Sequence, residues 1–165
     1  MHSVTLDHDT AAKRNDNMTR YTFDKQAVLA VLNRILEAEL TGVVKYTHFS
    51  FMIFGLNRLP LVTWFREQAN ESLLHAHEVG EMITNIGESP SFALDSLKVG
   101  AESQDTMEIL RASLAHEEHA LSLYRELVDL VKDKSIMLEE FARKMIATEE
   151  MHCGEVDKMI RQPGL

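Results

Sequence analysis

Residues 107–131 read MEILRASLAHEEHALSLYRELVDLV. Apolar side chains recur in this stretch at positions 110, 114, 121, 124, 128 and 131, a spacing that places them on one face of an α-helix. The middle of that face, position 117, is a glutamate. The stretch therefore predicts a long amphipathic helix that carries a carboxylate at the centre of its buried side.

Three more segments, 23–53, 60–86 and 138–159, have the same helical period. The chain has seven Gly and three Pro in 165 residues, too few for the turns of a many-stranded sheet but enough to separate a few long helices. Residues 88–103 show no sustained period and are too long for a tight turn. We predict an all-α fold, a four-helix bundle of two antiparallel hairpins joined by a long crossover.

Composition limits the domain organisation and the class of partner. Residues 1–20 are polar and aperiodic, which predicts a disordered tail before one four-helix domain at 21–162. The single cysteine, Cys153, excludes a CxxC zinc ribbon and fits a reducing compartment. The net charge of −9 argues against a broad nucleic-acid surface. Without a signal peptide or a long apolar stretch, we expect a cytoplasmic protein that does not bind membranes.

Each predicted helix carries one glutamate within its apolar face. The acids are Glu39, Glu71, Glu117 and Glu149, and the second and fourth helices add His75 and His152. Converging carboxylates without cations would each cost several kcal/mol, and no Lys or Arg lies in the same rows. Two divalent ions would balance four ionised glutamates. Oxygen-rich ligands with one imidazole per ion favour iron or manganese over copper, and the lack of thiolates argues against structural zinc.

The chain also repeats itself at one offset. A separation of 78 residues links Glu39 to Glu117, Tyr46 to Tyr124, and Glu71 to Glu149. The histidines break the repeat by one, because the second helix has Glu-x-x-x-His where the fourth has Glu-x-x-His. We predict a π-bulge between Glu71 and His75, which inserts a residue without changing the helix faces on either side. The alternative is a regular helix in which His75 reaches the ion from one turn along.

This constellation resembles the ferritin-like di-iron carboxylate proteins, most of all the bacterioferritins, over residues 24–160. The resemblance rests on Leu32-Asn33, Glu39-Leu40-Thr41 with Tyr46, Glu71 to His75 with Pro90, Glu117, and Glu149-Glu150-Met151-His152. It implies a ferroxidase site that oxidises Fe(II) with O2 or H2O2 and serves iron detoxification or storage.

The family pattern also implies a role for each residue. Glu71 and Glu149 would bridge two irons, and Glu39 and Glu117 would each cap one. His75 and His152 would supply nitrogen. Tyr46 and Tyr124 would donate hydrogen bonds beside the ligands or trap radicals, although Tyr124 fits plain aromatic packing at least as well.

Three departures from the family pattern matter. The family has Glu-x-x-His on the second helix, one residue shorter than here. Ser72 follows Glu71, where bacterioferritins place a haem-ligating Met, so we expect no haem. Only 13 residues follow His152, whereas cage-forming members continue into a fifth helix. We therefore expect a homo-oligomer, a dimer or larger, rather than the large storage cage.

Two other readings remain open. The same site could serve a di-manganese catalase or peroxidase, and a metal-free bundle could be a helical interaction or DNA-protecting module. DNA-protecting mini-ferritins build their site between subunits from fewer helices, whereas here every helix supplies a ligand. The remaining mid-chain histidines fall beside or opposite the inward rows, and we expect surface residues or neighbours of the ligands: His48, His77, His116 and His119.

Overall fold

Four long helices dominate the computed structural model, which describes residues 21–91, 93 and 104–161. They are α1 (Lys25–Met52), α2 (Arg58–Asn85), α3 (Thr106–Val131) and α4 (Ile136–Ile160). No strand occurs among the described residues, so the all-α prediction is confirmed. The predicted tail at 1–20 and most of the predicted crossover lie outside the described residues.

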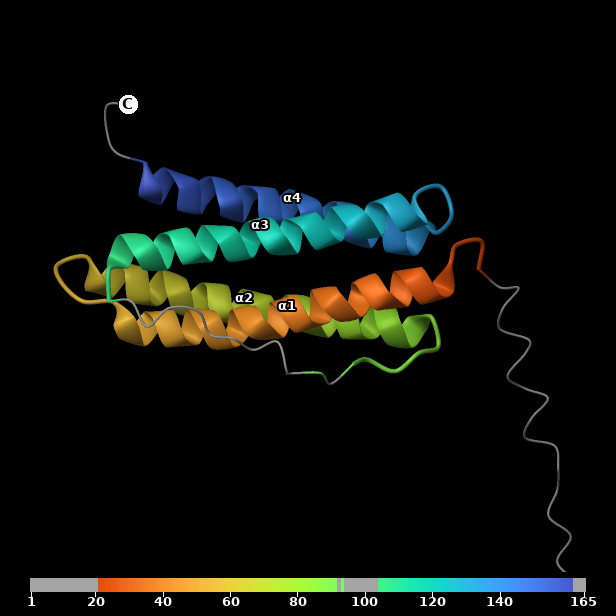
Figure 1. The fold of residues 1–165 in the computed structure, drawn as a ribbon, viewed down its shortest axis with the longest axis horizontal. Helices are drawn as coiled ribbons and strands as arrows, with labels where there is room; N and C mark the ends of the chain where they lie inside the picture. The colour runs from red at the N-terminus through yellow and green to blue at the C-terminus, as the bar shows by residue number, and fades with distance from the viewer. Residues whose placement is uncertain (1–20, 92, 94–103, 162–165) are drawn as a thin grey trace, which may run out of the picture.

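The helices form two antiparallel hairpins (Figure 1). Short connections join α1 to α2 and α3 to α4, whereas α2 ends at the opposite end of the bundle from the start of α3. That placement confirms the predicted long crossover. Helix α1 packs against α2 and α3, and α4 packs against α3, while the backbones of α2 and α4 approach each other much less. None of the four helices has a run long and apolar enough to span a membrane.

Local signals explain where the helices begin and how they are connected. Asp24, Asp105 and Ser135 precede α1, α3 and α4, and each side chain accepts a hydrogen bond from a backbone N–H of the first turn. Gly55 and Gly87 follow α1 and α2 with φ of 90° and 79°. Glycine adopts this left-handed conformation without steric cost.

Two apolar clusters fill the bundle, and a layer of buried polar residues lies between them. One cluster includes Leu32, Ile83 and Leu127, and the other includes Phe49 and Phe65. The buried polar residues are Glu39, Gln68, Ser72, His75, Ser113, His116, Glu117 and Glu149, together with Ser50. This layer draws on all four helices, so the fold brings polar chemistry from distant parts of the sequence to one level.

Candidate metal centre

The polar layer contains most of the predicted ligands in buried positions. Glu39, Glu117 and Glu149 are 2–4% exposed, and His75 is 9% exposed. His152 is half-buried. None of the described Lys or Arg side chains forms an ion pair with the three buried glutamates. Lys45 interacts electrostatically with Glu117 but forms no ion pair with it.

These residues form two groups that share Glu149. In one, Glu39, His75 and Glu149 place a ligand atom each within 4.8 Å of one another, and in the other Glu117, Glu149 and His152 do the same. His75 Nδ1 lies 3.5 Å from Glu39 Oε1 and 3.3 Å from Glu149 Oε1. Two ligand atoms about 2.1 Å from a common ion lie up to about 4.2 Å apart. The spacing thus suits an ion in each group.

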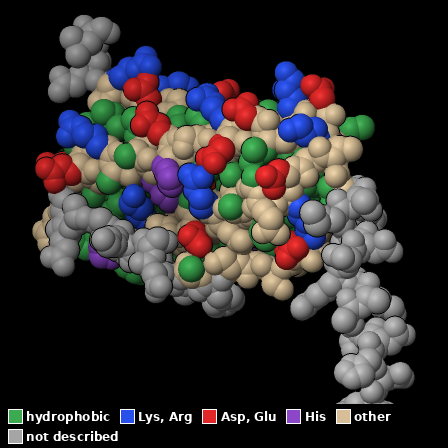
Figure 2. Space-filling view, turned by 45° about the vertical axis from the view of Figure 1, so that its right-hand side comes forward, with side chains coloured by type: hydrophobic (Ala, Val, Ile, Leu, Met, Phe, Trp, Pro, Cys, Tyr) green, Lys and Arg blue, Asp and Glu red, His purple; other side chains and the backbone are tan. Residues whose placement is uncertain are grey.

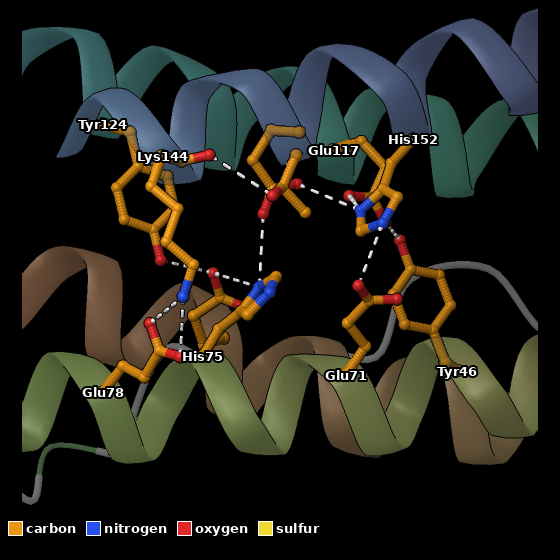
Figure 3. A network of polar contacts seen from close by, with 11 residues as sticks. Tyr46, Glu71, His75, Glu78, Glu117, Tyr124, Lys144 and His152 are labelled. Carbon is orange, nitrogen blue, oxygen red and sulfur yellow. Dashed lines mark hydrogen bonds and ion pairs between the residues drawn. The ribbon is translucent and has the colours of Figure 1, made fainter. Parts of the chain in front are cut away.

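Two tyrosines hold the outer carboxylates in a reciprocal arrangement. Tyr46 of α1 donates a hydrogen bond to Glu117 of α3, and Tyr124 of α3 donates one of 2.8 Å to Glu39 of α1. Figure 3 shows the two phenols approaching the site from its two ends. Both rings are buried. The 78-residue repeat of the sequence is therefore visible as a two-fold relation between α1 and α3.

Helix α2 departs from that symmetry. It is α-helical throughout Arg58–Asn85, so the predicted π-bulge between Glu71 and His75 is wrong and the helix is regular. With regular spacing, the residue three before His75 is Ser72, which is buried and lines the site. The Glu71 side chain is 38% exposed; it lines the central cavity but belongs to neither group.

Glu71 instead lies at the seam between α2 and α4. Its Oε1 is 3.4 Å from His152 Nε2, the ring nitrogen that faces away from Glu149 (Figure 3). Two turns further along α2, Glu78 pairs with Lys144 of α4 at 3.0 Å. These side-chain contacts link α2 to α4. The site therefore has one buried shared carboxylate and a second, outer one.

Carboxylates raise the pKa of both imidazoles. Burial alone would lower it, but contacts with Glu149 and Glu39 raise the pKa of His75 to about 9. Contacts with Glu117 and Glu149 raise the pKa of His152 to about 10 against the same effect of burial. Both rings therefore hold a proton at neutral pH when no ion is bound, and these two positive charges offset the buried acids.

The glutamates respond differently to burial. Burial raises the pKa of Glu39, and it raises that of Glu117 to about 8. Burial acts in the same direction on Glu149, but hydrogen bonds with His152 and His75 lower its pKa to about 2. The shared carboxylate is thus the ionised centre of the group, as a ligand of two cations would need to be.

His116 is a site residue whose burial the sequence pattern did not reveal. It is 8% exposed and lines the central cavity, whereas His77 and His119 are exposed as expected. Its ring stands edge-on to Tyr46, with the centroids 5.6 Å apart. Burial and the nearby charge of Lys45 lower the pKa of His116 to about 4. This imidazole is therefore uncharged at neutral pH.

The centre of the site has little free space. A cavity of about 10 Å³ lies among the side chains, roughly enough for one water-sized sphere. Its lining is dominated by carboxylates and imidazoles from all four helices. Such a donor set fits iron or manganese ions, and small adjustments of the side chains would bring them to ligand distance.

Comparison with known proteins agrees with this geometry. The family model of the ferritin-like domain matches residues 29–163. The chain belongs to the ferritin-like family. It is 30% identical to a bacterioferritin of Rhodobacter capsulatus over 137 residues, which are 81% of this chain and 82% of that protein. The resemblance to the ferritin-like proteins and to the bacterioferritins, inferred from the sequence, is therefore confirmed.

Solved structures share the fold. The crystal structure of the Rhodobacter capsulatus bacterioferritin, described with a metal-free dinuclear site and haem iron, gives a TM-score of 0.68 at 27% identity, over 81% of this chain and 82% of that one. A dodecameric thioferritin of Bacteroides fragilis gives 0.76 at 20% identity, over 82% and 85%. A Dps protein of Vibrio cholerae gives 0.77 at 15% identity, over 83% and 91%. The last two likenesses concern the fold alone.

Proposed function

We propose that this ferritin-like protein is a di-iron ferroxidase, which binds Fe(II) and oxidises it with O2 or H2O2 in iron detoxification or storage. The observation that carries the proposal is Glu149, a buried carboxylate shared by two groups of ligands and without a Lys or Arg partner among the described residues. A shared ionised carboxylate holds two cations at a short distance from each other, which suits a reaction that takes one electron from each.

The reaction balances with two irons. Each Fe(II) gives up one electron to become Fe(III), and the two electrons reduce H2O2 to two waters or O2 to H2O2. Glu39 and His75 would bind one iron, Glu117 and His152 the other, and Glu149 both. Ionised ligands around the pair stabilise the higher charge of Fe(III) more than that of Fe(II), which favours the oxidised product.

The remaining residues support the ligands or the approach of substrate. Tyr46 lies against Glu117, where it fixes the carboxylate and can supply an electron or a proton close to the bound iron. Glu71 is proposed as an outer ligand on the side of His152 rather than as the second bridge. No side chain of the site requires haem, and we propose a cytoplasmic homo-oligomer that needs no nucleic acid.

The surface fits this assignment. Acidic and basic side chains are interspersed on the face drawn in Figure 2, with no broad basic area on that face. Binding to the phosphate backbone of DNA depends on clustered Lys and Arg, so the net charge of −9 favours iron chemistry over a DNA-coating role.

The test is aerobic addition of Fe(II) to metal-free protein. We expect a rapid ferric absorbance that saturates at about two irons per chain, and its loss in Glu117→Ala. Oxygen release from H2O2 by manganese-loaded protein, without iron oxidation, would instead identify a catalase. Protein that takes up neither metal would refute the di-metal proposal and leave a structural or interaction module.

A further inference from the structure

A second cavity, of about 220 Å³, opens between α1 and α3 outside the polar layer. Its walls are Arg34, Glu37, Ala38 and Thr41 from α1 and His116 and His119 from α3. Of the described residues, His116 is the one that lines both this outer cavity and the cavity at the metal centre. The imidazole therefore forms the wall between solvent and the ligands.

His116 is buried beside the metal ligands without belonging to them. The residue is 8% exposed, and it is in neither group of ligands around Glu149. Its ring stands edge-on to the buried Tyr46 ring, with the centroids 5.6 Å apart. An imidazole that lines both cavities and belongs to neither group is placed to hold an ion in passage between them.

Gly42 makes room for this arrangement. A Cβ at this position of α1 would lie 2.9 Å from His116 Nε2 and 2.7 Å from Ser72 Oγ, both closer than side-chain carbons normally approach. Glycine inside a helix costs about 0.5–1 kcal/mol relative to alanine, so it indicates a required close approach. The imidazole nitrogen and the hydroxyl thus sit side by side over the bare backbone of α1.

The outer cavity has the chemistry of a cation entrance. Glu37 and His119 provide oxygen and nitrogen ligands, and Thr41 adds a hydroxyl. The charge of Arg34 is taken up by Glu126, which accepts two hydrogen bonds of 2.9 Å from it. The positive charge in the wall is therefore balanced, and the cavity can accept a hydrated divalent ion.

We propose that His116 is a transfer ligand, which takes a divalent transition-metal ion from the outer cavity between α1 and α3 and passes it to the ligands around Glu149. This inference rests on the proposed di-metal function and adds its route of supply. The competing route runs through the α2–α4 seam, where Glu71 meets His152. The two routes enter from different sides of the bundle, so variants can separate them.

The experiment follows Co(II) uptake by metal-free protein, using the visible absorption of bound Co(II) in stopped flow and at equilibrium. His116→Phe fills the wall and removes the lone pair, and His116→Gln keeps an oxygen ligand. His77→Ala, an exposed histidine of α2, is the matched control, and Glu71→Gln tests the other route. Circular dichroism confirms that each variant is folded.

We expect His116→Phe to take up Co(II) about tenfold more slowly than the natural protein while reaching the same final number of ions. His116→Gln falls between the two, and His77→Ala matches the natural protein. The transfer role is overturned if His116→Phe takes up Co(II) as fast as the natural protein. It is also overturned if His116→Gln takes up Co(II) at the natural rate but binds one ion fewer at equilibrium. Failure of the natural protein to bind Co(II) at all overturns the proposed function instead.

Discussion

The imidazole rings of His75 and His152 lie nearly parallel, with planes 17° apart and centroids separated by 6.3 Å. Glu149 serves both, because its Oε1 is 3.3 Å from Nδ1 of His75 and its Oε2 is 3.6 Å from Nδ1 of His152. One carboxylate thus faces a ring from α2 with one oxygen and a ring from α4 with the other. The two halves of the site depend on each other through this single side chain.

Glu149→Gln is expected to remove binding of both ions, because the amide lacks the charge that the two groups share. The affinity for Co(II) falls at least about 100-fold at each site, measured by absorbance titration. The matched control is Glu150→Gln, which changes the next residue, an exposed partner of Arg125. A variant that loses one ion and keeps the other would contradict the shared role.

Stability of the metal-free protein should fall as the pH rises. The pKa values of His75 and His152 are raised from 6.5 to about 9 and about 10, so the folded state holds protons that the unfolded chain releases. Their contribution is complete below pH 6.5 and is lost as the pH rises through the folded-state values. Thermal unfolding in the presence of a chelator, followed between these limits, measures the loss.

Ion binding should displace these protons and that of Glu117. Imidazoles and carboxyls bind metals in their deprotonated form, and the pKa of Glu117 is raised to about 8, so we expect at least about three protons released per chain near neutral pH. Calorimetry in buffers of different ionisation enthalpy counts them. In the double variant His75→Gln/His152→Gln the count should fall by about two and the alkaline loss of stability should become smaller. An unchanged count would place the released protons on other groups.

The spacing of apolar residues in the sequence predicts some of the buried site residues and misses others. Glu117 and Glu149 interrupt apolar rows, so their burial could be predicted from the sequence. His116 could not, because it belongs to a row with Ser113 and Ala120, small or polar residues that a hydrophobic pattern assigns to the surface. The only sequence signal for it was Gly42, a glycine within a predicted helix.

The extra residue of α2 shows a second limit. The repeat suggested that Glu71 and Glu149 are equivalent, but helical geometry at fixed spacing turns Glu71 about 100° away from the position of Ser72. A π-bulge would have restored the match, and α2 does not contain one. Sequence spacing gives the set of available ligands, whereas the path of the helix decides which of them point inward.

The two tyrosine hydrogen bonds should act on different ions. Tyr46→Phe frees Glu117 and is expected to weaken the ion on the His152 side, whereas Tyr124→Phe frees Glu39 and weakens the ion on the His75 side. Loss of a hydrogen bond to a ligand typically reduces affinity about 10- to 100-fold. A Co(II) titration of His152→Ala combined with each variant separates the two sites. Equal effects of both variants on the remaining ion would refute the assignment.

Gly42→Ala tests the close approach on α1. The new Cβ would meet Ser72 and His116, and we expect the variant to be about 1–3 kcal/mol less stable than the control. That control is Gly80→Ala, in α2, where a Cβ meets nothing within 4 Å and the substitution should stabilise by about 0.5–1 kcal/mol. Urea unfolding measures both. Equal stabilisation by the two substitutions would show that Ser72 and His116 move away from the new Cβ at no energetic cost.

Glu71→Gln should separate an outer ligand from a bridging one. The Glu71 carboxylate contacts His152 from the solvent side and stands apart from the group around His75. We therefore expect the variant to keep both ions, with weaker affinity confined to the His152 side. A bridging carboxylate, by contrast, would cost affinity at both positions, as expected for Glu149→Gln. Equal losses at both sites, in equilibrium Co(II) titration, would show that Glu71 swings inward when metal binds and completes a second bridge.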